Sequence, residues 1–124
     1  MIGVGIDVAK SKSMVAILSD DGEIIKNPFE IANTESGLEY LCSVIGEFTD
    51  EVYCVVESTS VYHFPIVSYL QENDIFVSVV KPLIIKKYAS MDIRKVKTDK
   101  MDSLKLASYV IDNHRHLVNY SADS

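Results

Sequence analysis

Four acidic residues stand at positions where they could form a metal site: Asp7, Glu57, Asp99 and Asp102. Asp7 lies in the apolar run that opens the chain, and Glu57 ends the run Val-Tyr-Cys-Val-Val-Glu. Burying an ionised carboxylate among Ile and Val side chains is costly, so each of these two must be partnered, protonated or bound to a cation. We therefore expect Asp7 and Glu57 to be functional residues on two buried strands.

Asp99 and Asp102 are three residues apart, a spacing that puts both side chains on one face of a helix. Two ordinary alternatives exist, since Asp102 also suits the first turn of a helix and Asp99 could pair with Lys97 or Arg94. If all the carboxylates converge, they repel one another unless divalent cations lie between them. Oxygen ligands select hard ions, so the sequence predicts Mg²⁺ or Mn²⁺ here.

The basic residues are concentrated in one part of the chain. The net charge is -6 at pH 7, yet eight of the twelve Lys and Arg residues lie between positions 81 and 105, where there are only three Asp residues and no Glu. A basic segment around Asp99 and Asp102 suits a phosphodiester substrate, because phosphate contacts dominate affinity for nucleic acid. We predict nucleic-acid contacts for Lys86, Lys87, Arg94, Lys95, Lys97 and Lys100. The alternative for these residues is an ordinary solvated helix face.

Hydrophobic periodicity predicts a mixture of strands and helices. The expected strands cover residues 2–8, 13–19, 23–31, 52–57 and 75–80, and the expected helices follow Thr34 or Asn33 or start at Tyr62, Pro82 and about Thr98. The first helix is expected to include Phe48, and Asp20-Asp21-Gly22 is expected to form a hairpin turn. Pro65 is tolerable only in the first turn of its helix. Met91 to Lys97 lacks apolar periodicity and is expected to be a loop.

This order of elements is that of an α/β, ribonuclease-H-like fold, with a mixed five-stranded sheet flanked by helices. The fourth strand is expected to pair in parallel with the first, which would make Asp7 and Glu57 neighbours on central strands. The last helix would then lie across the sheet and bring Asp99 and Asp102 to them. Ligands bind at the carboxyl ends of strands in open α/β sheets, which is where these residues would meet.

Length and composition predict one domain in the cytoplasm. The 124 residues, nearly half of them apolar, can bury one ordinary core. No apolar run approaches the roughly 20 residues that cross a bilayer, and no signal-type start is present. Cys42 and Cys54 lack metal-ligand spacing, so we expect neither a disulfide nor zinc.

Three segments together resemble the N-terminal domain of the DEDD transposases of bacterial insertion sequences. They are Gly5-Ile-Asp7-Val-Ala-Lys10, Val56-Glu57-Ser-Thr-Ser-Val-Tyr62-His63 and Lys97-Thr98-Asp99-Lys-Met-Asp102-Ser-Leu-Lys-Leu-Ala107. In that family the catalytic domain looks like the RuvC junction resolvase. The resemblance implies that Asp7, Glu57, Asp99 and Asp102 hold magnesium for cleaving and joining DNA strands. The family commonly has a glycine at the position of Ser60, a departure that leaves the carboxylates untouched.

The resemblance also implies features beyond residues 1–124. Members are two to three times longer, and a second domain carries a serine thought to attack the DNA, so this chain looks like the catalytic domain of a longer transposase. An element-encoded guide RNA and a homo-oligomer of the full-length protein are further expected partners. The expected chemistry uses two metal ions, one at the attacking oxygen and one at the leaving oxygen.

The same residues leave three other functions to consider as alternatives. A junction-resolvase-like nuclease would use the four carboxylates equally well. An actin-like or sugar-kinase ATP-binding half would need a glycine-rich phosphate turn after the first strand, and Ala9-Lys10-Ser11-Lys12-Ser13 does not provide one. The third is a catalytically idle DNA- or RNA-binding module. His63, a lone histidine near a helix start, is more typical of packing or capping than of catalysis.

Overall fold

The computed structural model describes residues 1–58, 61–91 and 102–121. Five strands form one sheet in the order β3-β2-β1-β4-β5. Their bounds are β1 Ile2–Val8, β2 Lys12–Ser19, β3 Ile24–Ala32, β4 Val52–Glu57 and β5 Phe76–Val80. Each observed strand lies within one residue of its predicted bounds.

The pairing of the central strands is as the sequence predicts. β1 pairs antiparallel with β2 and parallel with β4, and β4 pairs parallel with β5. The turn between β2 and β3 contains Gly22, whose φ of 82° favours a residue without a Cβ. The mixed sheet of a ribonuclease-H-like fold is therefore confirmed.

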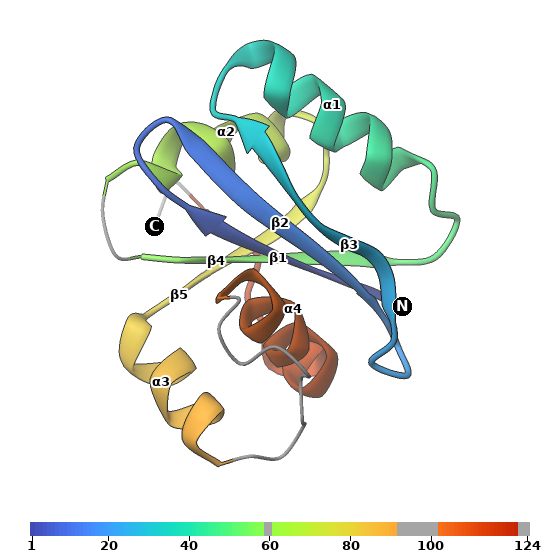
Figure 1. The fold of residues 1–124 in the computed structure, drawn as a ribbon, viewed down its shortest axis with the longest axis vertical. Helices are drawn as coiled ribbons and strands as arrows, with labels where there is room; N and C mark the ends of the chain where they lie inside the picture. Colours follow the sequence, from blue (N-terminus) through green and yellow to red (C-terminus); the bar gives the residue numbers. More distant parts are fainter. Residues whose placement is uncertain (59–60, 92–101, 122–124) are drawn as a thin grey trace.

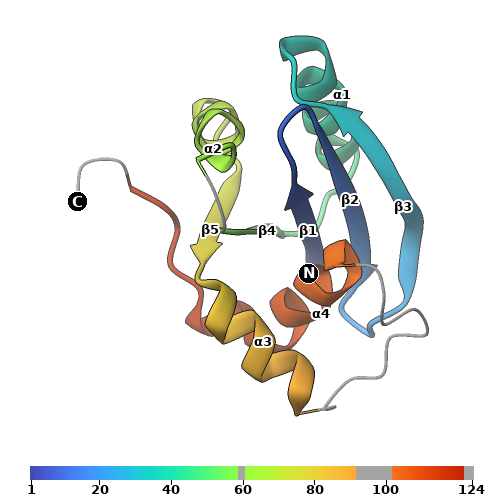
Figure 2. The same cartoon turned by 60° about the vertical axis from the view of Figure 1, so that its left-hand side comes forward.

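Helices cover both faces of this sheet (Figures 1 and 2). One face carries α1 (Glu35–Gly46) and α2 (His63–Glu72), and the other carries α3 (Pro82–Ser90) and α4 (Asp102–Asn113). A short 3₁₀ helix, His114–His116, follows α4. None of the helices in the described ranges is both long and apolar enough to cross a membrane.

Strand alternation divides the core between the two faces. Ile6 and Val56 are fully buried in the larger core on the side of α1 and α2. Val55, the neighbour of Val56, belongs instead to a cluster with Leu106 and Val110 of α4. Residues one position apart on β4 thus point to different helical layers, which fixes the face on which Glu57 lies.

Local sequence signals account for several helix boundaries. Thr34 is the cap of α1, where its side chain accepts a 3.2 Å hydrogen bond from Gly37 N. Pro65 lies in the first turn of α2, as required. The prediction that Phe48 continues α1 is wrong, because the helix ends at Gly46 and Phe48 packs on the core from the following segment. The predicted helix start at Thr98 and the loop beyond Met91 lie outside the described residues, which resume at Asp102.

Candidate metal centre

Asp7 and Glu57 lie beside each other at the carboxyl ends of two adjacent parallel strands. The register pairs Ile6 with Val56, and the two acids are the next residues on β1 and β4. Since side chains alternate along a strand, Asp7 shares a face with Gly5, and Glu57 shares one with Val55. Both are on the face that α4 covers. Each acid is half-buried.

Helix α4 lies unusually close to β1, and glycine is the reason. A Cβ atom placed on Gly5 would collide with the backbone carbonyl oxygen of Ser103 and the backbone nitrogen of Ala107. At Gly3 a Cβ would come within 2.8 Å of Ile111 Cδ1. The two glycines therefore let the backbone of α4 rest directly on the strand. This contact brings the N-terminus of α4, where Asp102 lies, to the edge that carries Asp7.

The three carboxylates interact electrostatically. The pKa of Asp7 is raised first by burial and then by the negative charge of Asp102. The pKa of Glu57 is raised by burial, then by Asp102, then by Asp7. Like charges in a partly shielded position disfavour ionisation, and each acid therefore holds its proton more tightly than an isolated carboxyl group would. This edge of the sheet is a site of accumulated negative charge.

Asp102 is the most exposed member of this set. Its side chain is 65% exposed, and its Oδ1 is 3.8 Å from Lys105 Nζ one turn along α4. Within the described residues no three His, Cys, Asp or Glu side chains are close enough together to hold a metal ion. The described carboxylates are thus near enough to perturb one another but are not closed around a common point. Asp99, the fourth predicted ligand, lies outside the described residues.

Two of the six predicted nucleic-acid contacts lie within the described residues. Lys86 and Lys87 are exposed on α3. Neither has an ion pair among the residues that the structure describes. The other four, Arg94, Lys95, Lys97 and Lys100, lie outside the described ranges.

One contact of the site was not foreseen from the sequence. Lys105 was not expected to contact Asp102, although the three-residue spacing on a helix is a signal that could have found it. His63, expected to pack or to cap a helix, is 4% exposed; its Nδ1 has no hydrogen-bond partner among the residues that the structure describes, and its side chain does not cap α2. Its ring lies against Phe64, with centroids 4.2 Å apart, which agrees with the packing role.

The sequence matches the family model DEDD_Tnp_IS110, described as Transposase, over residues 4–124. The chain belongs to this DEDD transposase family. The match includes all four predicted ligands and all six predicted nucleic-acid contacts. It identifies a recombinase-type, nuclease-like catalytic domain, as the sequence resemblance implied. Among curated proteins no relative matches.

Solved structures similar to this transposase domain identify its fold. Thermus thermophilus RuvC has a TM-score of 0.66 at 11% identity, with 96% of this chain and 99% of that chain covered. The same protein in complex with a Holliday junction substrate gives 0.66 at 10% identity, with the same coverage. A ROK family protein from Streptococcus pneumoniae in complex with sucrose has a TM-score of 0.51 at 15% identity and covers 73% of this chain and 38% of that one. The domain is therefore RuvC-like in fold over nearly its whole length.

Proposed function

We propose that this domain cleaves and transfers DNA phosphodiester bonds at a divalent-metal centre made by Asp7, Glu57, Asp99 and Asp102. The observation that carries the proposal is the electrostatic coupling of Asp7, Glu57 and Asp102 at one edge of the sheet. The chain belongs to a transposase family, and ligands bind at the carboxyl ends of strands in open α/β sheets. We therefore propose that the reaction takes place where these carboxylates gather. Asp99 is assigned to the centre from its spacing to Asp102 alone.

The donor set fits Mg²⁺ or Mn²⁺. All the proposed ligands are carboxylate oxygens, which hard cations prefer. Burial and then neighbouring negative charge raise the pKa values of Asp7 and Glu57, and a bound cation would favour the ionised forms of both carboxyl groups. Four carboxylates supply enough ligands for two such ions. When bound, the metal would supply positive charge to the oxygens of the phosphodiester that gains and loses bonds.

The residues of this domain would set the geometry of the metal centre. The β1–β4 register keeps the backbones of Asp7 and Glu57 side by side, so both carboxylates would be available to one metal centre. Asp102 would give up its contact with Lys105 in order to bind the metal. The side chain of Lys105 would then be free to contact the substrate. α4, seated on Gly5, sets how closely Asp102 can approach.

DNA is the proposed substrate and partner. The similar Thermus thermophilus RuvC was solved with a Holliday junction, and this family is a transposase family. Lys86 and Lys87, exposed on α3, are proposed to contact DNA phosphates. Arg94, Lys95, Lys97 and Lys100 are assigned the same role from sequence.

We further propose that residues 1–124 are one domain of a longer transposase that acts in the cytoplasm. The attacking serine would belong to another domain, and the working enzyme would be a homo-oligomer that selects DNA with a guide RNA. On this proposal the domain alone binds metal but does not recombine donor and target DNA.

Thermal unfolding in the presence of Mg²⁺ or Mn²⁺ tests the metal centre. Ligands that bind only the native state raise its stability, so millimolar metal should raise the Tm of the wild type. Asp7→Asn and Glu57→Gln should remove most of that rise without unfolding the protein. Asp20→Asn, which removes one negative charge from the β2–β3 turn, should keep it. A wild-type Tm that is independent of metal would reject the centre.

An assay for a covalent protein–DNA product tests the reaction. The full-length protein with its element DNA and RNA should form the product, and Asp7→Ala, Glu57→Ala or Asp102→Ala should each abolish it. Robust metal-dependent cleavage by residues 1–124 alone would favour a junction-resolvase-like nuclease instead. Product formation that survives the loss of Asp7 and Glu57 would reject both functions.

A further inference from the structure

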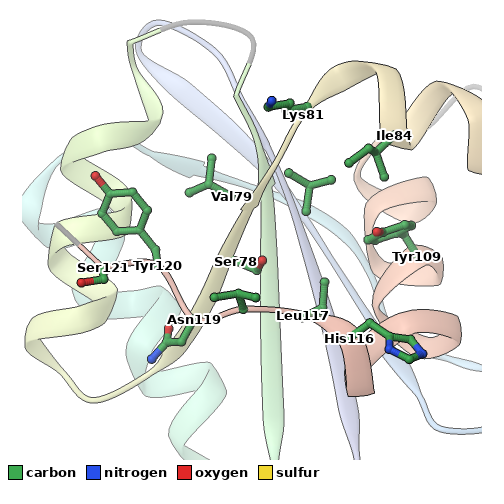
Figure 3. A pocket seen from close by; sticks show the side chains of 12 residues that line it. Ser78, Val79, Lys81, Ile84, Tyr109, His116, Leu117, Asn119, Tyr120 and Ser121 are labelled. Atoms are coloured by element: carbon green, nitrogen blue, oxygen red, sulfur yellow. The ribbon is translucent and has the colours of Figure 1, made fainter. Parts of the chain in front are cut away.

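An open groove of about 550 Å³ lies between β5, the two helices α3 and α4, and the segment that follows the 3₁₀ helix (Figure 3). Ser78 and Val79 of β5 form its floor, with Ile84 of α3 and Tyr109 of α4 on one side. Leu117 and the residues after it form the opposite side. A second groove of about 250 Å³ shares the lining residues Ile84 and Tyr109 with the first. We call the two grooves together the path over the junction of α3 and α4.

Part of this path lies at the carboxylate edge of the sheet. Val80 pairs with Glu57 in the β4–β5 register, and its carbonyl oxygen accepts a 3.0 Å hydrogen bond from Ser58 N. Lys81, the next residue, is exposed and lines the groove. Lys87 lines the second groove. Each of the two grooves therefore has a lysine in its lining, and the first of these lysines follows the strand position opposite Glu57.

Aromatic rings stand along the path in fixed orientations. The ring of Tyr109 packs edge to face against Tyr88, with centroids 5.3 Å apart and an interplanar angle of 85°. Tyr88 is itself held by hydrogen bonds of 2.6 Å with Ser108 and Asp112. Tyr109 is thus preoriented, and exposed His116 provides a second ring in the same groove. The hydroxyl group of Ser78, a residue only 5% exposed, lies on β5 across the groove from both rings (Figure 3).

We propose that this path receives an unpaired segment of nucleic acid that leaves the reacting phosphodiester. Tyr109 and His116 offer ring faces to bases, and Lys81 and Lys87 contact phosphates. Grooves of this kind bind single strands with little sequence preference, because every base has a stackable face and every linkage carries a negative charge. The proposal rests on the proposed function, since it takes the Glu57 edge as the place of reaction.

A peptide added to the edge of β5 is the competing occupant. The chain already fills part of that edge, since Tyr120 N donates to Val77 O at 2.8 Å and Val77 N donates to Asn119 Oδ1 at 3.0 Å. The two grooves that are left open each have a lysine in their lining together with aromatic rings, which favours a polyanion with flat bases over an extended apolar peptide.

Fluorescence anisotropy with a labelled twelve-nucleotide oligothymidylate tests the proposal on the chain of residues 1–124. Tyr109→Leu should weaken binding roughly five- to hundredfold, the loss of one stacked base, whereas Tyr109→Phe should bind like the wild type. Lys81→Gln should reduce the slope of log affinity against log salt by about 0.7. Tyr40→Leu removes a ring on α1 at the opposite face, which is 48% exposed and therefore more accessible than the half-buried ring of Tyr109, and should have no effect.

Photocrosslinking keeps the test decisive if Tyr109→Leu folds poorly. Wild-type protein irradiated with a 5-bromouracil oligonucleotide should carry its crosslink on the tryptic peptide of residues 106–115, which contains Tyr109, and none on the peptide of residues 13–26, which covers the turn between β2 and β3. Crosslinks confined to peptides that do not line the path, or binding that is indifferent to Tyr109→Leu and Lys81→Gln, would overturn the proposal and favour the peptide. Failure here is separable from failure of the metal centre, because Tyr109→Leu should keep the metal-induced rise in Tm and Asp7→Asn should keep oligonucleotide binding.

Discussion

Tyr88 on α3 and Asp112 on α4 are joined by a 2.6 Å hydrogen bond, in which Tyr88 Oη donates to Asp112 Oδ2. The bond crosses between two helices that the chain connects through residues 92–101. It therefore fixes the position of α3, and with it Lys86 and Lys87, relative to the helix that begins with Asp102.

Tyr88→Phe removes this bond and the 2.6 Å hydrogen bond with Ser108, and it keeps the ring against Tyr109. We expect a loss of about 1–3 kcal/mol in the free energy of unfolding, because the buried hydroxyl group of Ser108 loses this partner, whereas Asp112 is exposed to water. Urea unfolding measures the loss. Ser90→Ala, a hydroxyl removed from the exposed end of the same helix, is the control and should lose less.

Asp7 and Glu57 make the stability of the metal-free protein depend on pH. Their pKa values are raised on folding, so their stabilising contribution is complete below the ordinary carboxyl pKa near pH 4 and is lost as pH rises through the higher folded-state values. Asp7→Asn should therefore gain stability over the wild type between pH 4 and pH 7. Urea unfolding in EDTA at several pH values measures this difference, and a difference that stayed constant or shrank would contradict it.

Gly5→Ala should destabilise the protein by about 1–3 kcal/mol or more, since the new methyl group meets the backbone of α4 at Ser103 and Ala107 and neither atom can move alone. Gly46→Ala is the matched control, because a Cβ there meets nothing within 4 Å at the end of α1. The control should be neutral or slightly stabilising. Equal losses for both variants would show that α4 does not rest on β1 as described.

Lys86→Gln and Lys87→Gln should weaken binding to duplex DNA and flatten its salt dependence, each by about one unit of the log-log slope. Titrations at several salt concentrations measure the slope. Lys26→Gln serves as the control, since Lys26 lies on β3 at the far edge of the sheet, where it packs on Phe29 and Tyr40. A larger effect at Lys26 would put the DNA on that edge instead.

The sheet could be predicted from the sequence because each strand is marked by the pattern of its own residues. Alternation and apolar runs mark each strand, and a strand such as Val52–Glu57 reads the same in any context. The proximity of Asp7 to Glu57 then followed from topology, since parallel neighbours end at the same edge. The end of α1 at Gly46 was missed because Phe48 satisfies the helical spacing while packing from outside the helix.

The remaining features depend on contacts between distant segments, which no short pattern encodes. Gly5 carries no sign that a helix almost a hundred residues later will lie on it. The hydrogen bonds of Asn119 and Tyr120 with Val77 likewise depend on where α4 ends relative to β5. The groove beside them arises from this placement, so Tyr109 and His116 could not be singled out from their sequence neighbours.

The register between β1 and β4 has a consequence for errors in folding. The pairing that puts Asp7 beside Glu57 also puts Ile6 beside Val56 in the core. A slip of one residue would turn Glu57 toward the apolar interior and Val56 toward α4, so the chain would lose its core along with its carboxylate pair. The register that buries Ile6 and Val56 is therefore the same one that brings the two acids together, and a register shifted by one residue is disfavoured by the loss of the core.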